Sequence, residues 1–135
     1  MADNGITTIP SHSNVKHTID RLEAAAKAKG LTIFARIDHS AGAAAAAMAL
    51  RPTELLILGN ARGGTPLMQA QQTIGIDLPL KALVWQDASG KTWLSWNEPA
   101  WLARRHEVTG MEGPLAAMTN ALRDIAAKTT GSVVP

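Results

Sequence analysis

The spacing of apolar residues predicts an alternation of helices and strands along most of the chain. A first helix is expected after residue 13, because apolar positions recur there at steps of three and four. These positions are Val15, Ile19, Leu22 and Ala26. Gly30 is placed to end this helix in the left-handed conformation. The segment LTIFARID at 31–38 predicts a strand, with Ile33, Ala35 and Ile37 on one face.

The same rules predict the remaining elements. Further strands are expected at 6–9, 53–58, 80–86 and 92–96, and the last two form a hairpin across residues 87–90. Helices are expected at 39–50, 65–74, 99–105 and from 113 to about 128. The alanine-rich helix at 39–50 is expected to end before Pro52, because a residue that precedes proline avoids the α region.

The order of these elements favours an α+β fold with a largely antiparallel sheet of about five strands. A doubly wound parallel fold would require a further β-α-β repeat. A chain of 135 residues is expected to form one domain, 1–135, with an ordered core at about 6–128.

Charge and composition narrow the class of partner. The formal net charge is only +2, and the single adjacent basic pair is Arg104-Arg105, so no nucleic acid is expected as a partner. The longest stretch of low polarity, 41–50, is too short to cross a bilayer, so no membrane partner is expected either. There is no cysteine, which excludes disulfides and thiolate metal sites. The N-terminal MADNGITTIPSH lacks a secretory pattern, and we therefore expect a cytoplasmic protein.

The segment GNARGGTPLM at 59–68 is the strongest candidate for a binding loop. It follows an apolar strand and leads into a predicted helix, with Thr65 as the N-cap and Pro66 in the first helical position. It is not a nucleotide-binding P-loop, because Thr65 stands where that motif requires lysine.

Two interpretations of this segment remain open. The backbone N–H groups at a helix N-terminus attract anions, Arg62 would add donors, and Asn60 could orient a carboxylate or a hydroxyl. Alternatively, Gly63 and Gly64 serve only a tight turn and the close packing of strand against helix.

Two histidines are candidates for metal binding or proton exchange. His39 directly follows Asp38, and His106 stands beside Glu107. No HxH, HxxxH or HExxH spacing occurs, so no metal-ligand set is predicted. The alternatives are a helix N-cap or a satisfied polar residue for His39, and a cation at a helix C-terminus for His106.

Four tryptophans fall between residues 85 and 101. Trp85 shares a strand face with Lys81, whereas Trp93 and Trp96 point to opposite faces of the next strand. Tryptophan is common at interface anchors, so Trp85, Trp93 and Trp96 are candidates for a dimer contact or a ligand wall. The alternative is simple core packing.

Three blocks of the sequence resemble one protein family. They are ARIDHSAGA, TELLILGNARGGTPLMQAQQTIGIDLPLKALVWQD and GKTWLSWNEPAWLARRH. Together they look like the small bacterial and archaeal proteins of domain-of-unknown-function family 302, over about residues 6–128. The resemblance implies a two-layer fold of the TATA-binding-protein-like type, with a sheet on one side and two main helices on the other. It also implies a dimer with no assigned activity.

These observations lead to one hypothesis and two alternatives. The leading hypothesis is a dimeric, non-catalytic module that binds a small anionic ligand. Its site would comprise His39, Asn60, Arg62, Gly63, Gly64 and Thr65. The alternatives are a purely structural or regulatory homodimer, and a metal-assisted enzyme that uses His39 and His106. The residues predict neither a catalytic set nor a cofactor.

Overall fold

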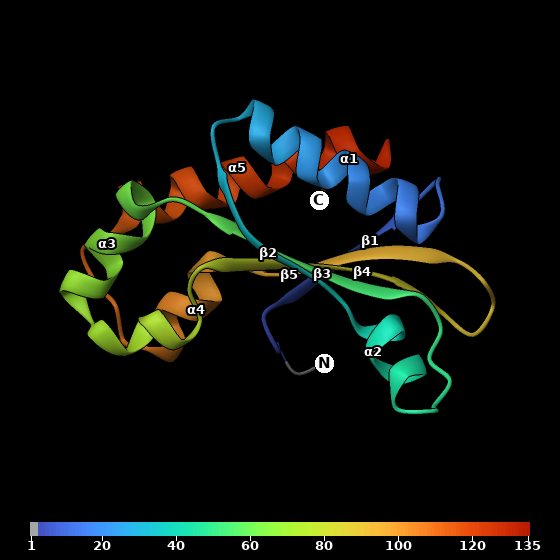
Figure 1. Ribbon diagram of the computed structural model, residues 1–135. Coiled ribbons are helices and arrows are strands. Elements are labelled where there is room, and N and C mark those ends of the chain that lie inside the picture. The colour runs from blue at the N-terminus through green and yellow to red at the C-terminus, as the bar shows by residue number, and fades with distance from the viewer. Residues whose placement is uncertain (1–2) are drawn as a thin grey trace.

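The computed structural model describes residues 3–135. Its centre is a five-stranded antiparallel sheet in the order β1-β5-β4-β3-β2. The strands are β1 (Ile6–Ser11), β2 (Thr32–Asp38), β3 (Thr53–Gly59), β4 (Leu80–Gln86) and β5 (Thr92–Asn97). The two longest helices, α1 (Val15–Ala28) and α5 (Glu112–Thr130), lie side by side on one face of the sheet (Figure 1). The predicted α+β class is therefore confirmed, while its TATA-binding-protein-like type stays a prediction.

The hydrophobic core lies between this helix pair and the sheet. Alternate strand residues such as Leu56 and Val84 point towards the helices and are fully buried. Ile19 of α1 and Ile125 of α5 meet them from the other layer. Full burial of one such side chain contributes roughly 1.5–3 kcal/mol, so this layer supplies most of the driving force for folding.

Local signals set both ends of α1. Asn14 is the N-cap, and its side chain accepts a hydrogen bond from the His17 amide at 2.8 Å. Gly30 has a φ of +85°, which confirms the predicted left-handed helix end. Its amide donates to the carbonyl of Lys27 at 3.0 Å.

The helix α2 (His39–Ala45) is shorter than the predicted helix at 39–50. Ala47 already has a φ of +59°, and the chain continues in irregular conformation to β3. No residue of α2 is buried. Alanine propensity without a packed face rarely sustains a helix of three turns in water, which explains the early end.

A bulge in β2 overturns the predicted facing of that strand. The pairing register with β3 shifts between Ile33 and Ala35, so the side chains beyond the bulge change faces. Arg36 therefore lies on the helix side, where it donates to Asp20 of α1 at 2.7 Å and to Glu54 of β3 at 3.2 Å. The hydrogen bond from Arg36 lowers the pKa of Asp20 below its ordinary value.

The predicted hairpin of β4 and β5 and the short helix α4 (Pro99–Arg105) are confirmed. The hairpin turn is organised by Asp87, which accepts hydrogen bonds from the amides of Ser89 and Lys91 and from the indole of Trp93. These bonds lower the pKa of Asp87. The last helix, α5, continues through Thr130, two residues beyond the expected end of the ordered core.

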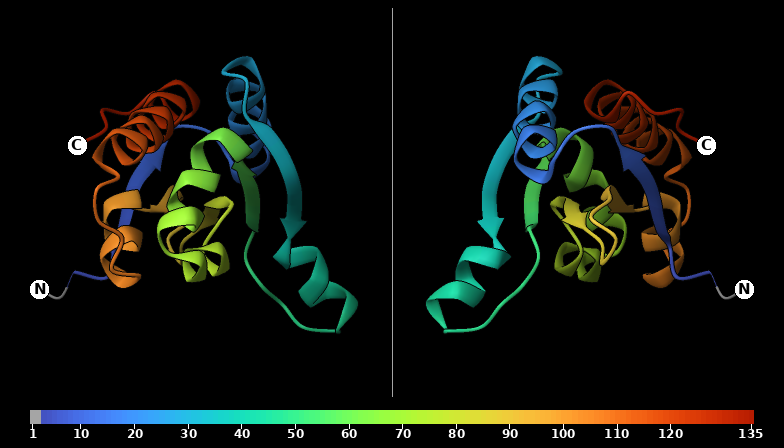
Figure 2. Two further views of the ribbon diagram at one scale, coloured as in Figure 1. Left: turned by 90° about the vertical axis from the view of Figure 1, so that its left-hand side faces the viewer. Right: turned by 90° about the vertical axis from the view of Figure 1, so that its right-hand side faces the viewer.

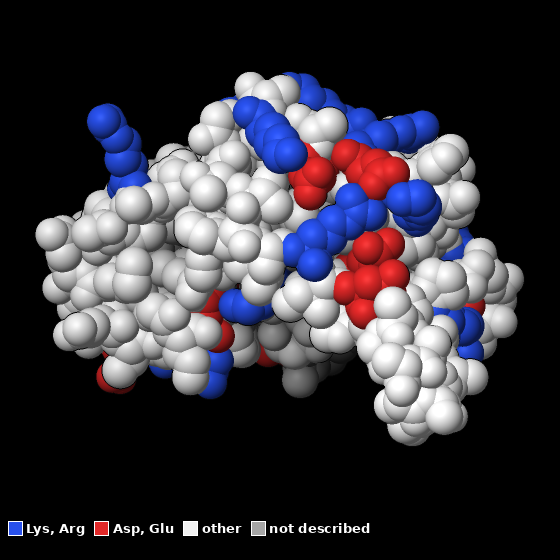
Figure 3. Space-filling model, in the orientation of Figure 1, with Lys and Arg blue, Asp and Glu red and all other residues white. Residues whose placement is uncertain are grey.

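Charged groups are unevenly distributed over the molecule. Figure 3 shows charges of both signs gathered over α1 and the neighbouring strand, where Lys16, Asp20 and Arg36 form ion pairs. The surface around α3 (Ala61–Ala70) in the same view is mostly uncharged. Within residues 3–135, no helix is both long enough and apolar enough to cross a membrane.

Candidate ligand-binding site

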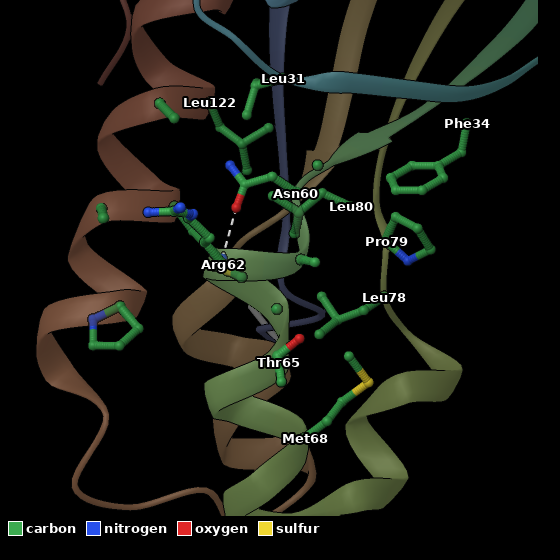
Figure 4. A pocket seen from close by; sticks show the side chains of 18 residues that line it. Leu31, Phe34, Asn60, Arg62, Thr65, Met68, Leu78, Pro79, Leu80 and Leu122 are labelled. Atoms are coloured by element: carbon green, nitrogen blue, oxygen red, sulfur yellow. Dashed lines mark hydrogen bonds between the residues drawn. The ribbon is translucent and has the colours of Figure 1, made fainter.

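A cavity of about 520 Å³ lies where α3 (Ala61–Ala70), α5 and the adjoining ends of β2, β3 and β4 meet (Figure 4). Its volume falls within the range of small-molecule sites. Most of its wall is apolar, and the larger contributors are Leu31, Phe34, Met68, Leu78, Met118 and Leu122. The polar side chains in the wall are Asn60, Arg62 and Thr65, and none of its described residues is a carboxylate.

The first turn of α3 forms the polar edge of this cavity, and it begins earlier than predicted. Asn60, not Thr65, is the N-cap, and its side-chain oxygen accepts from the Gly63 amide at 2.6 Å. Thr65 and Pro66 lie inside the helix, so the predicted start at residue 65 is wrong. Asparagine is a stronger N-cap than threonine, and this preference wins despite the two glycines that follow.

The two glycines at the start of α3 differ in how closely their neighbours approach. A Cβ atom at Gly63 would stand 3.2 Å from the capping oxygen of Asn60 and 3.6 Å from the Met118 methyl group. At Gly64, which is buried, it would stand 3.6 Å from a methyl group of Leu78. Only the contact at Gly63 is tight, so a larger residue there would press on the capping oxygen of Asn60, whereas the space at Gly64 allows an ordinary contact with Leu78.

Arg62 is an exposed cation at the rim of the cavity, next to Asn60 (Figure 4). Other arginines, such as Arg36 and Arg105, are held in ion pairs. Among residues 3–135, no carboxylate lies within salt-bridge distance of Arg62, and no residue forms a hydrogen bond with its side chain. Its charge is therefore available to a ligand. Since the Asn60 oxygen is used by the cap, the Asn60 group that could meet an anion is the amide nitrogen.

His39 does not join this site, contrary to prediction. In the ladder of β2 with β3, Thr32 pairs with Gly59 and Asp38 pairs with Glu54. Because a strand rises about 3.3 Å per residue, the six steps from Thr32 to Asp38 span roughly 20 Å. His39 follows Asp38 and therefore lies at the far end of the ladder. Asp38 caps α2, and its hydrogen bond from Ser40 lowers the pKa of its carboxyl group.

His106 connects α4 to the segment before β4. Its Nε2 lies 2.5 Å from an Asp77 carboxylate oxygen, and its Nδ1 lies 3.0 Å from the Thr73 hydroxyl. A carboxylate only accepts, so Nε2 donates to Asp77. Since both ring nitrogens have protein partners, neither is free for a metal.

The two histidines do not form the joint site that the metal-assisted enzyme required. They lie on or next to α2 and α4, which Figure 2 places on opposite sides of the molecule. Among residues 3–135, no group of three or more metal-ligating side chains comes together.

The tryptophans divide between the two faces of the sheet. Trp96 is 4% exposed, packs in the core and donates to Glu98, so its predicted role at an interface is wrong. Trp85 and Trp93 stack on the opposite face, with ring centroids 6.3 Å apart, and both remain half-buried. On that face, Figure 1 shows α2 and α4 at the two ends and no helix along the strands between them.

Sequence reasoning missed the apolar walls of the cavity. No motif in the sequence marks Leu78, Met118 or Leu122 as part of a site. The one usable signal was the pair Ala117 and Ala121, small residues one turn apart that widen the space beside Met118.

Comparison with known proteins agrees with this architecture. The model of the family described as "Domain of unknown function DUF302" matches residues 7–128. The chain therefore belongs to this family, as the sequence blocks predicted. A crystal structure of an uncharacterized conserved protein DUF302 from Bacillus stearothermophilus has the same fold. Its TM-score is 0.83 at 18% identity, and the match covers 93% of this chain and 98% of that one.

Relatives with closer sequences have a more specific name. "Fluoride-specific ion channel FluC 1" of Brucella suis biovar 1 (strain 1330) is 53% identical over 108 residues, which cover 80% of this chain and 42% of that protein. "Fluoride-specific ion channel FluC 2" of Brucella melitensis biotype 1 is 53% identical over the same length, with 40% of that protein covered. The chain thus spans about two fifths of the length of these relatives.

Proposed function

We propose that this chain is a non-catalytic module that binds a small anionic ligand in the cavity beside Arg62. The observation that carries the proposal is a cavity of about 520 Å³ that has a cation at its rim and no carboxylate in its described wall. Arg62 is the one charged residue among the described residues that line the cavity, so the site attracts a negative charge.

A binding role is favoured over catalysis by the polar groups of the cavity. Asn60, Arg62 and Thr65 can donate hydrogen bonds to an anion, but none of them is a general base at neutral pH. The Thr65 hydroxyl therefore has no partner in the wall that would activate it as a nucleophile.

The names of the Brucella relatives make fluoride one anion to test. A small, strongly hydrated ion loses its water in an apolar cavity and gains little from the walls. We therefore expect a larger anion to bind better, with fluoride as an informative comparison.

Arg62→Gln is the variant that tests this proposal, because it removes the charge and keeps a polar side chain. Arg123→Gln is the matched control, since Arg123 is exposed on α5 and does not line the cavity. Titration calorimetry with sodium fluoride, acetate and octanoate should detect binding of at least one anion to the wild type and to Arg123→Gln. Binding should weaken by about fivefold or more in Arg62→Gln. Equal affinity in both variants, or no binding of any anion at millimolar concentration, would reject the proposal.

A role in assembly has support from a separate observation. We define the open sheet face as the half-buried residues Leu55, Ile57, Leu83, Trp85 and Trp93. The solvated face of an antiparallel sheet is normally polar. This one carries the five apolar side chains together with Thr53, Lys81 and Ser95, and apolar patches with polar neighbours mark interaction sites. We propose that two copies of the chain pair through this face.

Leu83→Glu tests the assembly, because it places a charge in the middle of the open sheet face. Ile76→Glu is the control, since Ile76 is 74% exposed on η1 (Gln72–Ile76) and is not one of the residues of the open sheet face. Sedimentation velocity at micromolar concentration should show a dimer for the wild type and for Ile76→Glu, and a monomer for Leu83→Glu. A monomeric wild type would refute the idea.

A further inference from the structure

We infer that the ligand of this cavity is an amphipathic monocarboxylate, with an alkyl chain in the cavity and its carboxylate at Arg62. The inference rests on the proposed function and specifies the chemical class that the site selects. Three features of the cavity carry it: the composition of its walls, the position of its charge and the exposure of one aromatic ring.

The walls are apolar on both sides of the first turn of α3. Leu122 approaches from α5, and Leu78 approaches from the segment before β4 (Figure 4). Met118 of α5 also lines the cavity. A hydrophilic anion such as phosphate would leave these surfaces in contact with water. An alkyl chain would cover them, and each buried methylene tightens binding by up to about fourfold.

The polar groups gather at the Asn60–Arg62 edge. A guanidinium binds a carboxylate through two parallel hydrogen bonds, and the Asn60 amide nitrogen can add a third. This one-sided arrangement suits a ligand with a single charged end, because a second charge would be buried against the apolar walls without a partner.

Phe34 lies in the wall and is nevertheless 54% exposed. It sits at the bulge of β2, between the paired residues Ile33 and Ala35. A ligand chain that leaves the cavity on this side would cover the ring. Met68 and Met118 also line the space, and their flexible thioethers can adapt to chains of different length.

A series of ligands separates the contributions of chain and charge. Binding of acetate, hexanoate, octanoate and decanoate is measured by calorimetry, with decanol as the uncharged counterpart. We expect affinity to rise at least tenfold from hexanoate to decanoate, and decanol to bind at least fivefold more weakly than decanoate. Arg62→Gln should remove the preference for decanoate over decanol, and Arg123→Gln should keep it.

A pair of neighbouring substitutions tests whether the chain occupies this cavity. Ala117 and Ala116 are both exposed on α5, but only Ala117 lines the cavity. Ala117→Phe should therefore weaken decanoate binding by at least tenfold, whereas Ala116→Phe should leave it unchanged. Both substitutions are at exposed helix positions, so both variants should fold.

The outcomes distinguish this inference from the proposed function. If acetate binds as tightly as decanoate and Arg62→Gln weakens both, the anion site stands and the amphipathic ligand is refuted. If decanoate binds with equal affinity to Ala117→Phe and the wild type, the chain is not in this cavity and the inference fails. If no anion binds, both fail.

Discussion

Asn60 provides the sharpest test of how the first turn of α3 is built. The Asn60 side chain caps α3 by accepting from the Gly63 amide at 2.6 Å, and it lies beside Arg62 in the cavity wall. Asn60→Ala removes the cap, whereas Asn60→Asp keeps the accepting oxygen and adds a negative charge. The two variants therefore separate the structural role of this residue from its role in binding.

The expected magnitudes follow from these contacts. Loss of an N-cap costs about 1 kcal/mol, so Asn60→Ala should lower the free energy of unfolding by about that amount and the Tm by roughly 4 °C. Asn60→Asp should match the wild type or exceed it, since a carboxylate at a helix N-terminus is favourable. Its repulsion of a bound carboxylate, at about 1 kcal/mol, should weaken decanoate binding by roughly fivefold.

Urea unfolding followed by tryptophan fluorescence measures the stability, and calorimetry with decanoate measures the binding. If Asn60→Ala is as stable as the wild type, the assigned cap is wrong. If Asn60→Asp binds decanoate as tightly as the wild type, the anionic group does not lie at this edge of the cavity. This conclusion holds whatever the stability of the variant.

Two further predictions concern the scaffold. Gly5 and Gly90 both have positive φ, at +78° and +86°, but only at Gly5 would a Cβ overlap another residue, the indole ring of Trp101. Gly5→Ala should therefore lose about 1–3 kcal/mol more in urea unfolding than Gly90→Ala, and equal losses would contradict the contact with Trp101. The hydrogen bond from Arg36 lowers the pKa of Asp20, so this carboxylate stabilises the fold above pH 4, and the contribution is lost as pH falls through its folded pKa. Carbon-13 NMR should show that Arg36→Gln raises the pKa of Asp20, and an unchanged pKa would exclude this ion pair in solution.

The amino-acid sequence by itself determined the elements with local causes. The period of apolar residues in α1 and the left-handed conformation at Gly30 are properties of neighbouring residues, and so is the hairpin turn at Asp87. The backbone geometry of a helix or turn acts within a few residues, so a pattern in one segment is sufficient evidence for it. The family could also be predicted from the sequence, because the blocks that identify it are continuous stretches of the chain.

Competition between local signals was harder to resolve. Asn60 and Thr65 are both N-cap residues, and Thr65 precedes a proline that suits a helix start. The structure uses Asn60, at the point where β3 ends and the chain must turn towards α5. The bulge at Phe34 was not predicted either. The alternation of apolar and polar residues along β2 gives no sign of the shift in its pairing with β3.

Only the tertiary structure decided which residues share a site. The cavity unites segments near residues 31–34, 59–68, 78–80 and 114–122, which no spacing in the chain relates to one another. The register of β2 against β3 places His39 far from Arg62, and His106 is hydrogen-bonded to Asp77. Pairing register and helix packing are long-range relations, set by the burial of a common core. A single sequence can therefore indicate the charged group of a candidate site, whereas the apolar walls of that site depend on the fold.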